Sequence, residues 1–241
     1  MIGTSDLRGM FALTGKLRFS INCGNPILAG RRDDGALFGV SVDLANELAG
    51  ELDLPAELVG YDAAGKAVAG MLAGDVDVGF FAHDPIRAEH ISQTAPYVLI
   101  EGCYLVPDAS PIMNGGEVDR AGTRVAVGLG SAYDLFLTRT LQAAEIVRAP
   151  TSPAVVATFL EQRLDVAAGV RQQLAADAAV AGGLRLLPGR FMVIEQAMAV
   201  RKDRGSAAAD YLEAFVARMK TTGFVASALA RHGIEGASVA P

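Results

Sequence analysis

The chain has 241 residues, of which 51% are hydrophobic, and its 21 basic and 27 acidic side chains give a net charge of −6. This length accommodates one large domain or two small lobes, each with a buried core. Two cysteines are too few for a disulfide scaffold, the apolar content excludes an intrinsically disordered chain, and the acidic balance argues against nucleic-acid binding. We therefore expect a small-molecule or protein partner.

The N-terminal segment Met1–Gly15 does not have the form of a secretory signal. Asp6 and Arg8 interrupt it, and the apolar run Met10–Leu13 is shorter than the roughly 7 to 15 residues that a signal requires. No stretch reaches the roughly 18 apolar residues that span a bilayer. Either the chain stays in the cytoplasm, or an export signal has been removed from it.

In the first half of the chain, strand patterns alternate with helix patterns. The run Leu17–Asn22 mixes apolar and β-prone residues, and a Gly-Asn-Pro loop follows it. Apolar residues from Val42 recur at helical spacing and stop before Pro55, which predicts a helix of about three turns. The other elements predicted here are strands over 56–59, 76–81 and 97–106, a turn over 31–35 and a helix over 67–72.

The same alternation restarts in the second half of the chain. The predicted strands cover 124–127, 146–148, 164–168 and 184–187, and 191–201 is a long apolar stretch. The predicted helices cover 131–141, 153–160, 171–180, 206–222 and 224–232. Two successive α/β units, neither large enough to fill the chain, predict two lobes with largely parallel sheets.

A glycine loop at 128–132 leads into one of these helices. It lacks the second glycine of the G-x-S-x-G elbow and the last glycine of G-x-G-x-x-G, so neither a nucleophilic serine nor a dinucleotide site is indicated. A glycine loop at a helix N-terminus can still bind an anion, because free N–H groups point outward there. Ser131 is therefore either part of an anion site or an ordinary N-cap.

The chain has only three histidines, which are few candidate ligands for a metal site. His83, Asp84 and His90 lie close together, but Asp84 followed by Pro85 is better explained as the N-cap of a short helix. His232 lies near the C-terminus of the last predicted helix, where a cation suits the dipole. We expect no metal and no cofactor.

The sequence does not decide whether the two cysteines form a disulfide. Cys23 and Cys103 fit a disulfide bridge or two buried thiols, of which we favour the thiols. Cys23 has no C-x-x-C partner and no basic neighbour in sequence, so we expect no catalytic thiol.

Arg87 stands just inside the short helix that follows the strand 76–81. Open α/β sheets place ligand sites at the C-terminal ends of their strands, and the planar guanidinium can hold a carboxylate with two hydrogen bonds. Arg87 is therefore a candidate ligand contact, with an ordinary solvated arginine as the alternative.

Taken together, these segments resemble the periplasmic solute-binding proteins of ABC transporters, specifically the amino-acid-binding type called extracellular solute-binding protein family 3. The match runs from Gly15 to about Gly233, and no single motif in it is specific. The resemblance depends on the order and spacing of several motifs over most of the chain. The motifs are 15–18 (GKLR), 39–45 (GVSVDLA), 72–78 (LAGDVDV), 84–88 (DPIRA), 95–97 (APY), 124–131 (RVAVGLGS), 197–202 (AMAVRK), Leu212 and 223–224 (GF).

This resemblance implies the type II periplasmic-binding-protein fold, an α/β fold with two lobes joined by two hinge crossovers. Each lobe would be a mostly parallel sheet flanked by helices, with lobe 1 formed by 16–103 plus 196–241 and lobe 2 by 104–195. The lobes would close on the ligand like a hinged clamp, without a covalent step. The resemblance also implies an ABC transporter permease as partner, a monomer, and a periplasmic location, with the cytoplasm as the alternative for a chain without a signal.

The resemblance also implies ligand contacts. In the family, the arginine corresponding to Arg87 binds the ligand α-carboxylate, helped by the helix N-terminus at Gly130 and Ser131. The candidate ligand-binding residues are Arg87, Ala82, Phe81, Asn22, Asn25, Gly130, Ser131 and Arg171.

Departures from the family pattern bear on the ligand. The acidic residue that binds the α-amino group in many members falls at or beside Val170 here, followed by Arg171. The aromatic residue of the first loop is replaced by Asn25 or its neighbours. We therefore expect a small carboxylate-bearing ligand, amino-acid-like or an organic acid, and favour an anion without the amine whose acidic groups contact Arg87 and Arg171.

An enzyme on the same scaffold is the competing function. Some relatives of this family are dehydratases acting on prephenate or arogenate, and such chemistry needs a general acid. The candidate acids are Glu101, Asp62 and Glu195. A ligand-sensor domain has no support, because no DNA-binding helix pair or transmembrane anchor accompanies the lobes. We expect a binding protein rather than an enzyme.

Overall fold

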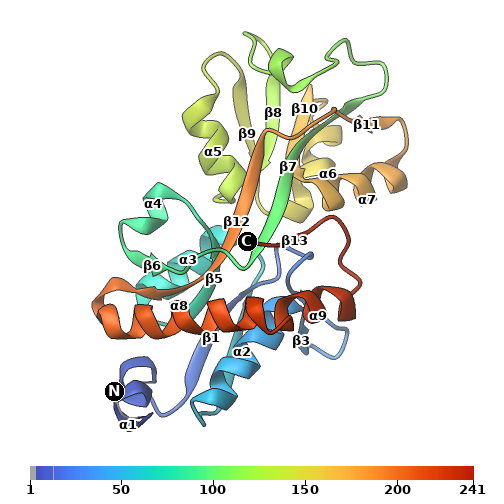
Figure 1. Cartoon of the computed structure of the whole chain (residues 1–241). Coiled ribbons are helices and arrows are strands. Elements are labelled where there is room, and N and C mark those ends of the chain that lie inside the picture. Colours follow the sequence, from blue (N-terminus) through green and yellow to red (C-terminus); the bar gives the residue numbers. More distant parts are fainter. Residues whose placement is uncertain (1–3, 13) are drawn as a thin grey trace. The chain divides into compact units, whose positions relative to one another are not determined.

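The computed structural model describes residues 4–12 and 14–241, and its chain forms two compact units (Figure 1). Unit 1 contains the residues up to Leu99 together with Glu195–Pro241, and unit 2 is Ile100–Ile194. The chain passes between the units within two long strands, β7 (Val98–Pro107) and β12 (Met192–Arg201). Part of the segment 1–15, in which the sequence predicts no export signal, lies outside the described residues.

Unit 1 is built on a mixed sheet. Its central strands are β4 (Ala56–Tyr61), β1 (Leu17–Asn22), β5 (Val78–Ala82) and β12, in that order. The first three run parallel, and β12 is antiparallel to β5. Two short antiparallel strands extend the sheet, β6 (Ile91–Gln93) on β12 and β13 (Ser238–Val239) on β7.

Helices cover both faces of this sheet. Successive side chains of β1 point to opposite faces, so Ser20 donates a hydrogen bond to Ala67 O of α3 while Phe19 stacks with Phe80 on the other face. The helices are α1 (Thr4–Phe11), α2 (Val40–Glu51), α3 (Ala64–Ala73), α4 (Pro85–Ala88), α8 (Ser206–Thr221) and α9 (Phe224–Arg231). A hairpin of β2 (Gly30–Arg31) and β3 (Leu37–Phe38) precedes α2.

A buried ion cluster ties three segments of unit 1 together. The Asp77 carboxylate, whose side chain is 1% exposed, accepts hydrogen bonds from the Arg18 guanidinium at 2.9 Å and from Arg204 at 2.7 Å. Arg18 lies on β1, Asp77 immediately precedes β5, and Arg204 lies in the 3-10 turn Lys202–Arg204 after β12. The cluster therefore fixes these three segments against one another.

The strands of unit 2 follow the order β7, β10 (Val166–Val170), β8 (Arg124–Gly128) and β9 (Glu145–Ala149). β10, β8 and β9 run parallel, and β7 is antiparallel to both β10 and β11 (Leu184–Leu186). Figure 1 shows α5 (Ala132–Thr140) on one side of this sheet, and α6 (Val155–Glu161) and α7 (Arg171–Ala181) on the other.

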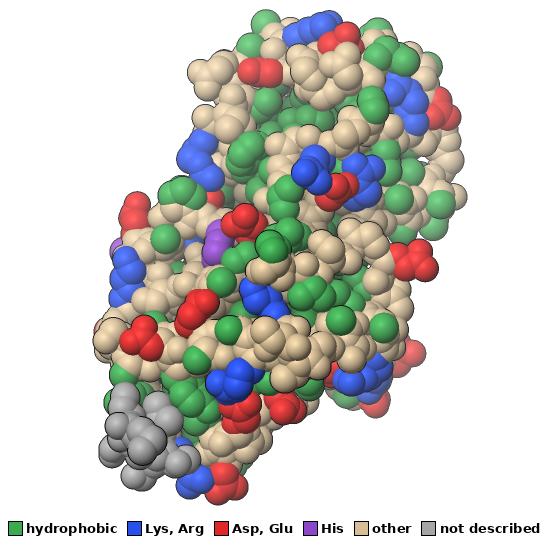
Figure 2. Space-filling view, viewed as in Figure 1, with side chains coloured by type: hydrophobic (Ala, Val, Ile, Leu, Met, Phe, Trp, Pro, Cys, Tyr) green, Lys and Arg blue, Asp and Glu red, His purple; other side chains and the backbone are tan. Residues whose placement is uncertain are grey.

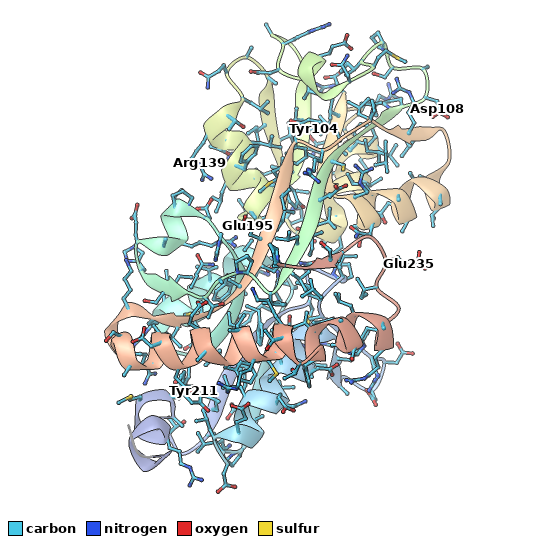
Figure 3. All side chains as sticks on the ribbon, viewed as in Figure 1. Tyr104, Asp108, Arg139, Glu195, Tyr211 and Glu235 are labelled. Atoms are coloured by element: carbon cyan, nitrogen blue, oxygen red, sulfur yellow. The ribbon has the colours of Figure 1, made fainter. Side chains whose placement is uncertain are left out.

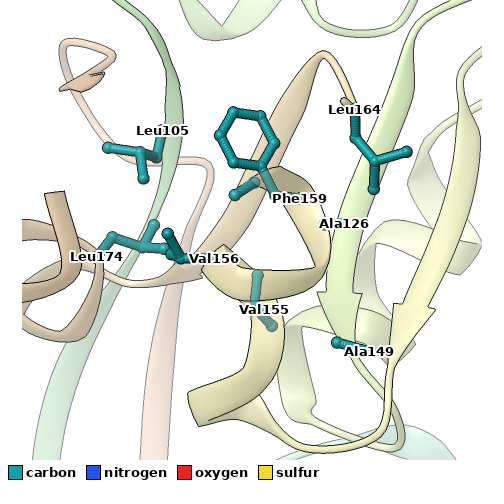
Figure 4. Packing of buried hydrophobic residues seen from close by; sticks show 9 residues of the cluster. Leu105, Ala126, Ala149, Val155, Val156, Phe159, Leu164 and Leu174 are labelled. Atoms are coloured by element: carbon teal, nitrogen blue, oxygen red, sulfur yellow. The ribbon is translucent and has the colours of Figure 1, made fainter. Parts of the chain in front are cut away.

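The core of unit 2 lies between its sheet and the helices α6 and α7 (Figure 4). Phe159, 1% exposed, is its largest side chain and sits among strand residues and Leu174 of α7. The cluster consists of Leu105, Ala126, Ala149, Val155, Val156, Phe159, Leu164, Ala167 and Leu174. Unit 2 therefore has a hydrophobic core built from its own residues.

The strand and helix alternation expected from the sequence is present in both units, with differences in detail. β10 begins at Val166 rather than Leu164, because Leu164 N still donates to Phe159 O at the end of α6. The helix expected over 153–160 begins as the 3-10 turn Ser152–Ala154. The helix α1, the β2–β3 hairpin and the short strands β6 and β13 were not expected.

Candidate functional site

The candidate residues of unit 1 lie at one edge of its sheet. Because β1, β4 and β5 are parallel, the loops that follow them leave from the same edge. Asn22 is the last residue of β1 and Asn25 follows it, Asp62 follows β4, and Arg87 lies on α4, which follows β5. The topology therefore places an arginine, an amide and a carboxylate at the carboxyl edge of unit 1.

Arg87 is a buried cation at this edge. The residue is 6% exposed, and one terminal guanidinium nitrogen donates to Ala82 O at 3.1 Å. Burial lowers the pKa of Arg87 to about 10, while the Asp84 carboxylate acts in the opposite direction. Arg87 therefore keeps its charge at neutral pH, in a place where that charge has lost most of its water.

The segment that leads to Arg87 is held by Gln93. Its side-chain nitrogen donates to Phe81 O at 3.1 Å and to Ala82 O at 3.2 Å. The Phe81 ring is 2% exposed and belongs to the hydrophobic cluster between α3 and β5. Asp84 accepts a hydrogen bond from Ile86 N at 2.9 Å, which confirms its predicted role as the N-cap of α4.

The loop after β1 is tight. Asn22 Oδ1 accepts from Gly24 N at 3.0 Å, and a Cβ atom on Gly24 would lie 2.5 Å from Asp62 O, so this position requires glycine. Asn25 O accepts from Leu28 N and Ala29 N. Asn25 Oδ1, by contrast, is buried and accepts no hydrogen bond from any of the described residues. A buried acceptor of this kind gains free energy from a donor brought by a ligand.

The glycine loop of unit 2 leads into α5 as predicted, with Ser131 as its N-cap. Ser131 Oγ accepts from Asp134 N at 3.0 Å. Gly130 N donates to Asp134 Oδ2 at 2.9 Å, and the Arg148 guanidinium donates to the same carboxylate at 3.0 Å. The Asp134 side chain is only 3% exposed. Its carboxylate therefore occupies this helix N-terminus, where the helix dipole favours a negative charge.

Asp134 is a structural residue of this loop that the sequence reasoning missed. The spacing Ser131-x-x-Asp134 resembles a capping box, in which the side chain three positions after the cap bonds back to a backbone N–H group at the helix start. That pattern would have indicated that a side chain of the chain itself occupies the start of α5, although the N–H group that it bonds here is that of Gly130.

Arg171, the other predicted cation of unit 2, is part of an ion cluster. Its Nε donates to Glu101 at 2.7 Å and a terminal nitrogen donates to Gly189 O at 2.5 Å, while Arg190 donates to the other Glu101 oxygen at 2.8 Å. Hydrogen bonds from Arg190 and then Arg171 hold the pKa of Glu101 below its usual value. Two arginines on one carboxylate leave a net positive charge in this cluster.

Each candidate general acid has a basic side chain beside it. Glu101 is held ionised as described, and a hydrogen bond from Lys66 lowers the pKa of Asp62. Glu195 lies 3.1 Å from His83 Nδ1 (Glu195 is labelled in Figure 3). A general acid needs a proton near neutral pH, which the arrangement of Glu101 and Asp62 disfavours.

The other predicted candidates have structural partners. Thr94 O lies 2.8 Å from His83 Nε2, and Asp43 lies 2.9 Å from His232 Nε2 at the end of α9. Cys23 and Cys103 are unbridged thiols, and burial raises the pKa of both. Among the described residues, no group of three His, Cys, Asp or Glu side chains is placed to hold a metal ion.

On the face that Figure 2 shows, basic and acidic side chains are interspersed. No helix in the described part of the chain combines the length and apolar character needed to cross a membrane.

The model of one protein family matches residues 17–234, which is most of the chain. This family is the bacterial extracellular solute-binding proteins, family 3. The chain belongs to this family. The resemblance stated from the sequence motifs is thereby confirmed. No curated protein matches the sequence.

Solved structures of binding proteins have the same fold. A mutant of ArgBP from T. maritima has a TM-score of 0.80 and 18% identity, covering 95% of this chain and 100% of that chain. The solute receptor for L-cysteine of Neisseria gonorrhoeae has a TM-score of 0.80 and 22% identity, covering 95% and 94%. At these identities the similarity establishes the fold, which confirms the predicted type II periplasmic-binding-protein class.

A third structure connects binding with catalysis. It is the ancestral amino acid-binding protein AncCDT-1, a precursor of cyclohexadienyl dehydratase, with a TM-score of 0.77 and 20% identity, covering 93% of this chain and 98% of that chain. The fold therefore carries both binding proteins and an enzyme lineage, so function must be argued from the site.

Proposed function

We propose that this family 3 protein is the solute receptor of an ABC-type importer and captures a small carboxylate-bearing ligand through Arg87. The observation that carries the proposal is the buried charge of Arg87 at the carboxyl edge of unit 1. A desolvated guanidinium gains more from an anionic ligand than a solvated one, because little water has to be displaced. The receptor would work in the periplasm with a permease as its partner.

Asn25 adds to the proposed ligand chemistry. Its buried, unbonded Oδ1 follows β1, the strand next to the one that leads to Arg87. An N–H or O–H group on the ligand would satisfy this oxygen. The ligand class is therefore a small carboxylic acid with a donor group near its carboxylate, either amino-acid-like or a hydroxy acid.

Unit 2 contributes a different kind of contact in this proposal. Gly130, Ser131 and Arg171 stay proposed contacts, and each already has an internal hydrogen bond. The Arg171 cluster has a surplus positive charge, which supports an organic anion over a zwitterion. The lobe closure expected from the sequence stays a prediction.

Calorimetric titration tests the proposal. Amino acids are compared with the hydroxy acids that carry a hydroxyl in place of the α-amino group, and with acids that have no hydrogen-bond donor at the α-carbon. Arg87→Met should weaken binding by about 2–5 kcal/mol, or roughly 30-fold or more, because a buried charge partner is lost. Arg87→Lys should be intermediate, since it keeps the charge and loses the planar fork.

The control is Arg120→Met, which removes an exposed arginine of unit 2 and should leave affinity unchanged. Binding of carboxylates that is equally tight in Arg87→Met and wild type contradicts the role of Arg87. Tight binding of a zwitterionic amino acid that survives Arg171→Ala and is lost in Val170→Lys contradicts the preference for an anion.

The enzyme alternative rests on the ancestral dehydratase precursor among the structures of the same fold. Incubation with cyclohexadienyl substrates and product analysis distinguishes the two. We propose that no product forms, because Glu101 and Asp62 are held without a proton by neighbouring cations.

A further inference from the structure

Unit 2 contains a surface cavity of about 380 Å³ that the proposed function does not use. All of its lining residues belong to unit 2. They include Tyr104 on β7 (labelled in Figure 3), Asn114 and Gly115 at the 3-10 turn Gly115–Glu117, and Leu187, Arg190 and Phe191 between β11 and β12. This volume lies in the range of small-molecule sites in proteins.

Aromatic rings form one wall of the cavity. The Tyr104 and Phe191 ring centroids are 4.5 Å apart, and Phe136 of α5 stacks on Phe191 at 6.1 Å. Tyr104 is 6% exposed, and burial raises its pKa to about 12, so the phenol stays neutral. A flat, neutral aromatic wall favours a ligand with a planar ring.

The segment that carries Phe191 is held in place by hydrogen bonds along its length. Leu187 N donates to Tyr104 O at 2.9 Å and Phe191 N donates to Gly102 O at 2.9 Å. Between them, Gly189 O accepts from Arg171 at 2.5 Å and from Cys103 Sγ at 3.4 Å. This wall is therefore preformed, which lowers the entropic cost of binding.

The opposite wall is held by Arg185. One terminal nitrogen of its guanidinium donates to Ser110 O and to Ile112 O, each at 2.9 Å. Met113 N donates to Glu117 at 2.7 Å, and Gly116 N donates to Asn114 Oδ1 at 3.1 Å. The loop 110–117 is thus fixed, and Gly115 in it lies close to the Tyr104 ring, because a Cβ there would be in van der Waals contact with that ring at 3.6 Å.

Arg190 supplies positive charge to the cavity. It lines the cavity with a side chain that is 54% exposed, and it shares Glu101 with Arg171, so the carboxylate does not neutralise both cations. A guanidinium has five N–H donors, and the hydrogen bond from Arg190 to Glu101 comes from one terminal nitrogen. The cavity therefore favours an anion.

We propose that this cavity is a second binding site, and that its ligand is a small aromatic carboxylate whose ring packs against Tyr104 and Phe191 and whose carboxylate bonds to Arg190. The site is separate from Arg87, which belongs to unit 1. None of its lining residues is a proposed contact of the solute that Arg87 binds, although Arg190 shares Glu101 with Arg171.

Fluorine NMR with 4-fluorobenzoate as the probe tests this proposal on the full chain. Wild-type protein should broaden and shift the probe signal at millimolar concentration, and unlabelled benzoate should displace the probe. The neutral 4-fluorobenzamide should bind to wild-type protein about tenfold more weakly than 4-fluorobenzoate does. The Arg190→Met variant should bind 4-fluorobenzoate about tenfold more weakly than wild type does, because in each case a charge-assisted hydrogen bond is lost. The control Arg139→Met removes an exposed arginine at the end of α5 and should bind the probe as wild type does.

A second pair of variants tests the location. Gly115→Leu adds a large side chain to the cavity lining beside Tyr104 and should abolish binding, whereas Gly50→Leu, at an exposed position of α2 with open space around it, should not. Arg87→Met should retain binding. The proposal is wrong if wild-type protein does not bind the probe, if Gly115→Leu binds it as wild type does, or if Arg87→Met abolishes binding.

Discussion

The buried ion cluster of unit 1 supports a quantitative prediction, the effect of Asp77→Ala. The Asp77 side chain is 1% exposed, and the side chains of its partners Arg204 and Arg18 are 8% and 19% exposed. Removing the carboxylate leaves the Arg204 guanidinium buried without its anion. Breaking a buried pair from one side costs about 3–5 kcal/mol, because the remaining charge has lost both water and partner.

For a chain of this size, each kcal/mol corresponds to about 2–4 °C in the melting temperature, so Asp77→Ala should lower it by about 6–20 °C. Asp75→Ala is the matched control, since Asp75 is exposed and lies two residues away. Asp75→Ala should change the free energy of unfolding by no more than about 0.5 kcal/mol. Urea unfolding measures the free energy of unfolding of both variants.

Hydrogen exchange then localises the effect. Peptides from β1, β5 and the 202–204 turn of unit 1 should lose protection in Asp77→Ala, whereas peptides from β8 and β10 of unit 2 should not. The double variant Asp77→Leu with Arg204→Leu should lose less stability than the two single changes added together, because the more buried of the two guanidinium groups is no longer left without its anion. Asp77→Ala with the stability of Asp75→Ala, or strictly additive changes, would refute the reasoning.

Two further predictions concern unit 2. Ser131→Ala should destabilise the protein by about 0.5–2 kcal/mol in urea unfolding through loss of the cap on Asp134 N, whereas Thr151→Ala, at an N-cap without a side-chain bond, should have less effect. The pKa of Glu101 is lowered in the folded state, so its stabilising effect is complete above the unfolded pKa and is lost as the pH falls through the folded one. Glu101→Gln should therefore be less stable than wild type at pH 7, and the difference should begin to shrink below the unfolded pKa of about 4.3 and disappear below the lower folded one; a difference that does not change with pH contradicts this.

Local patterns were enough to predict most of the fold. Glycine, proline and N-cap residues mark where elements begin and end, so β1, α4 and α5 lie within a residue of their expected positions. The missed elements have weak local patterns. β6 is a three-residue strand that forms because β12 passes beside it, and β13 depends in the same way on β7.

The candidate site was harder to predict, because its character depends on contacts distant in sequence. Position after a strand identified Arg87, but its burial by the packed chain could not be derived from neighbours in sequence. Arg171 was expected as a cation facing a ligand, and its bond to Glu101 joins residues 70 positions apart. No local spacing indicates such a pairing, or the absence of a partner for Asn25 Oδ1.

The carboxylate of Asp134 at the N-terminus of α5 affects which molecules can compete for this loop. An empty helix N-terminus attracts small inorganic anions such as sulfate and phosphate. Here Gly130 N and Arg148 are already bonded to a side chain that cannot diffuse away. A loop with such a tethered anion discriminates against inorganic ions, because any of them must displace a group held at high effective concentration.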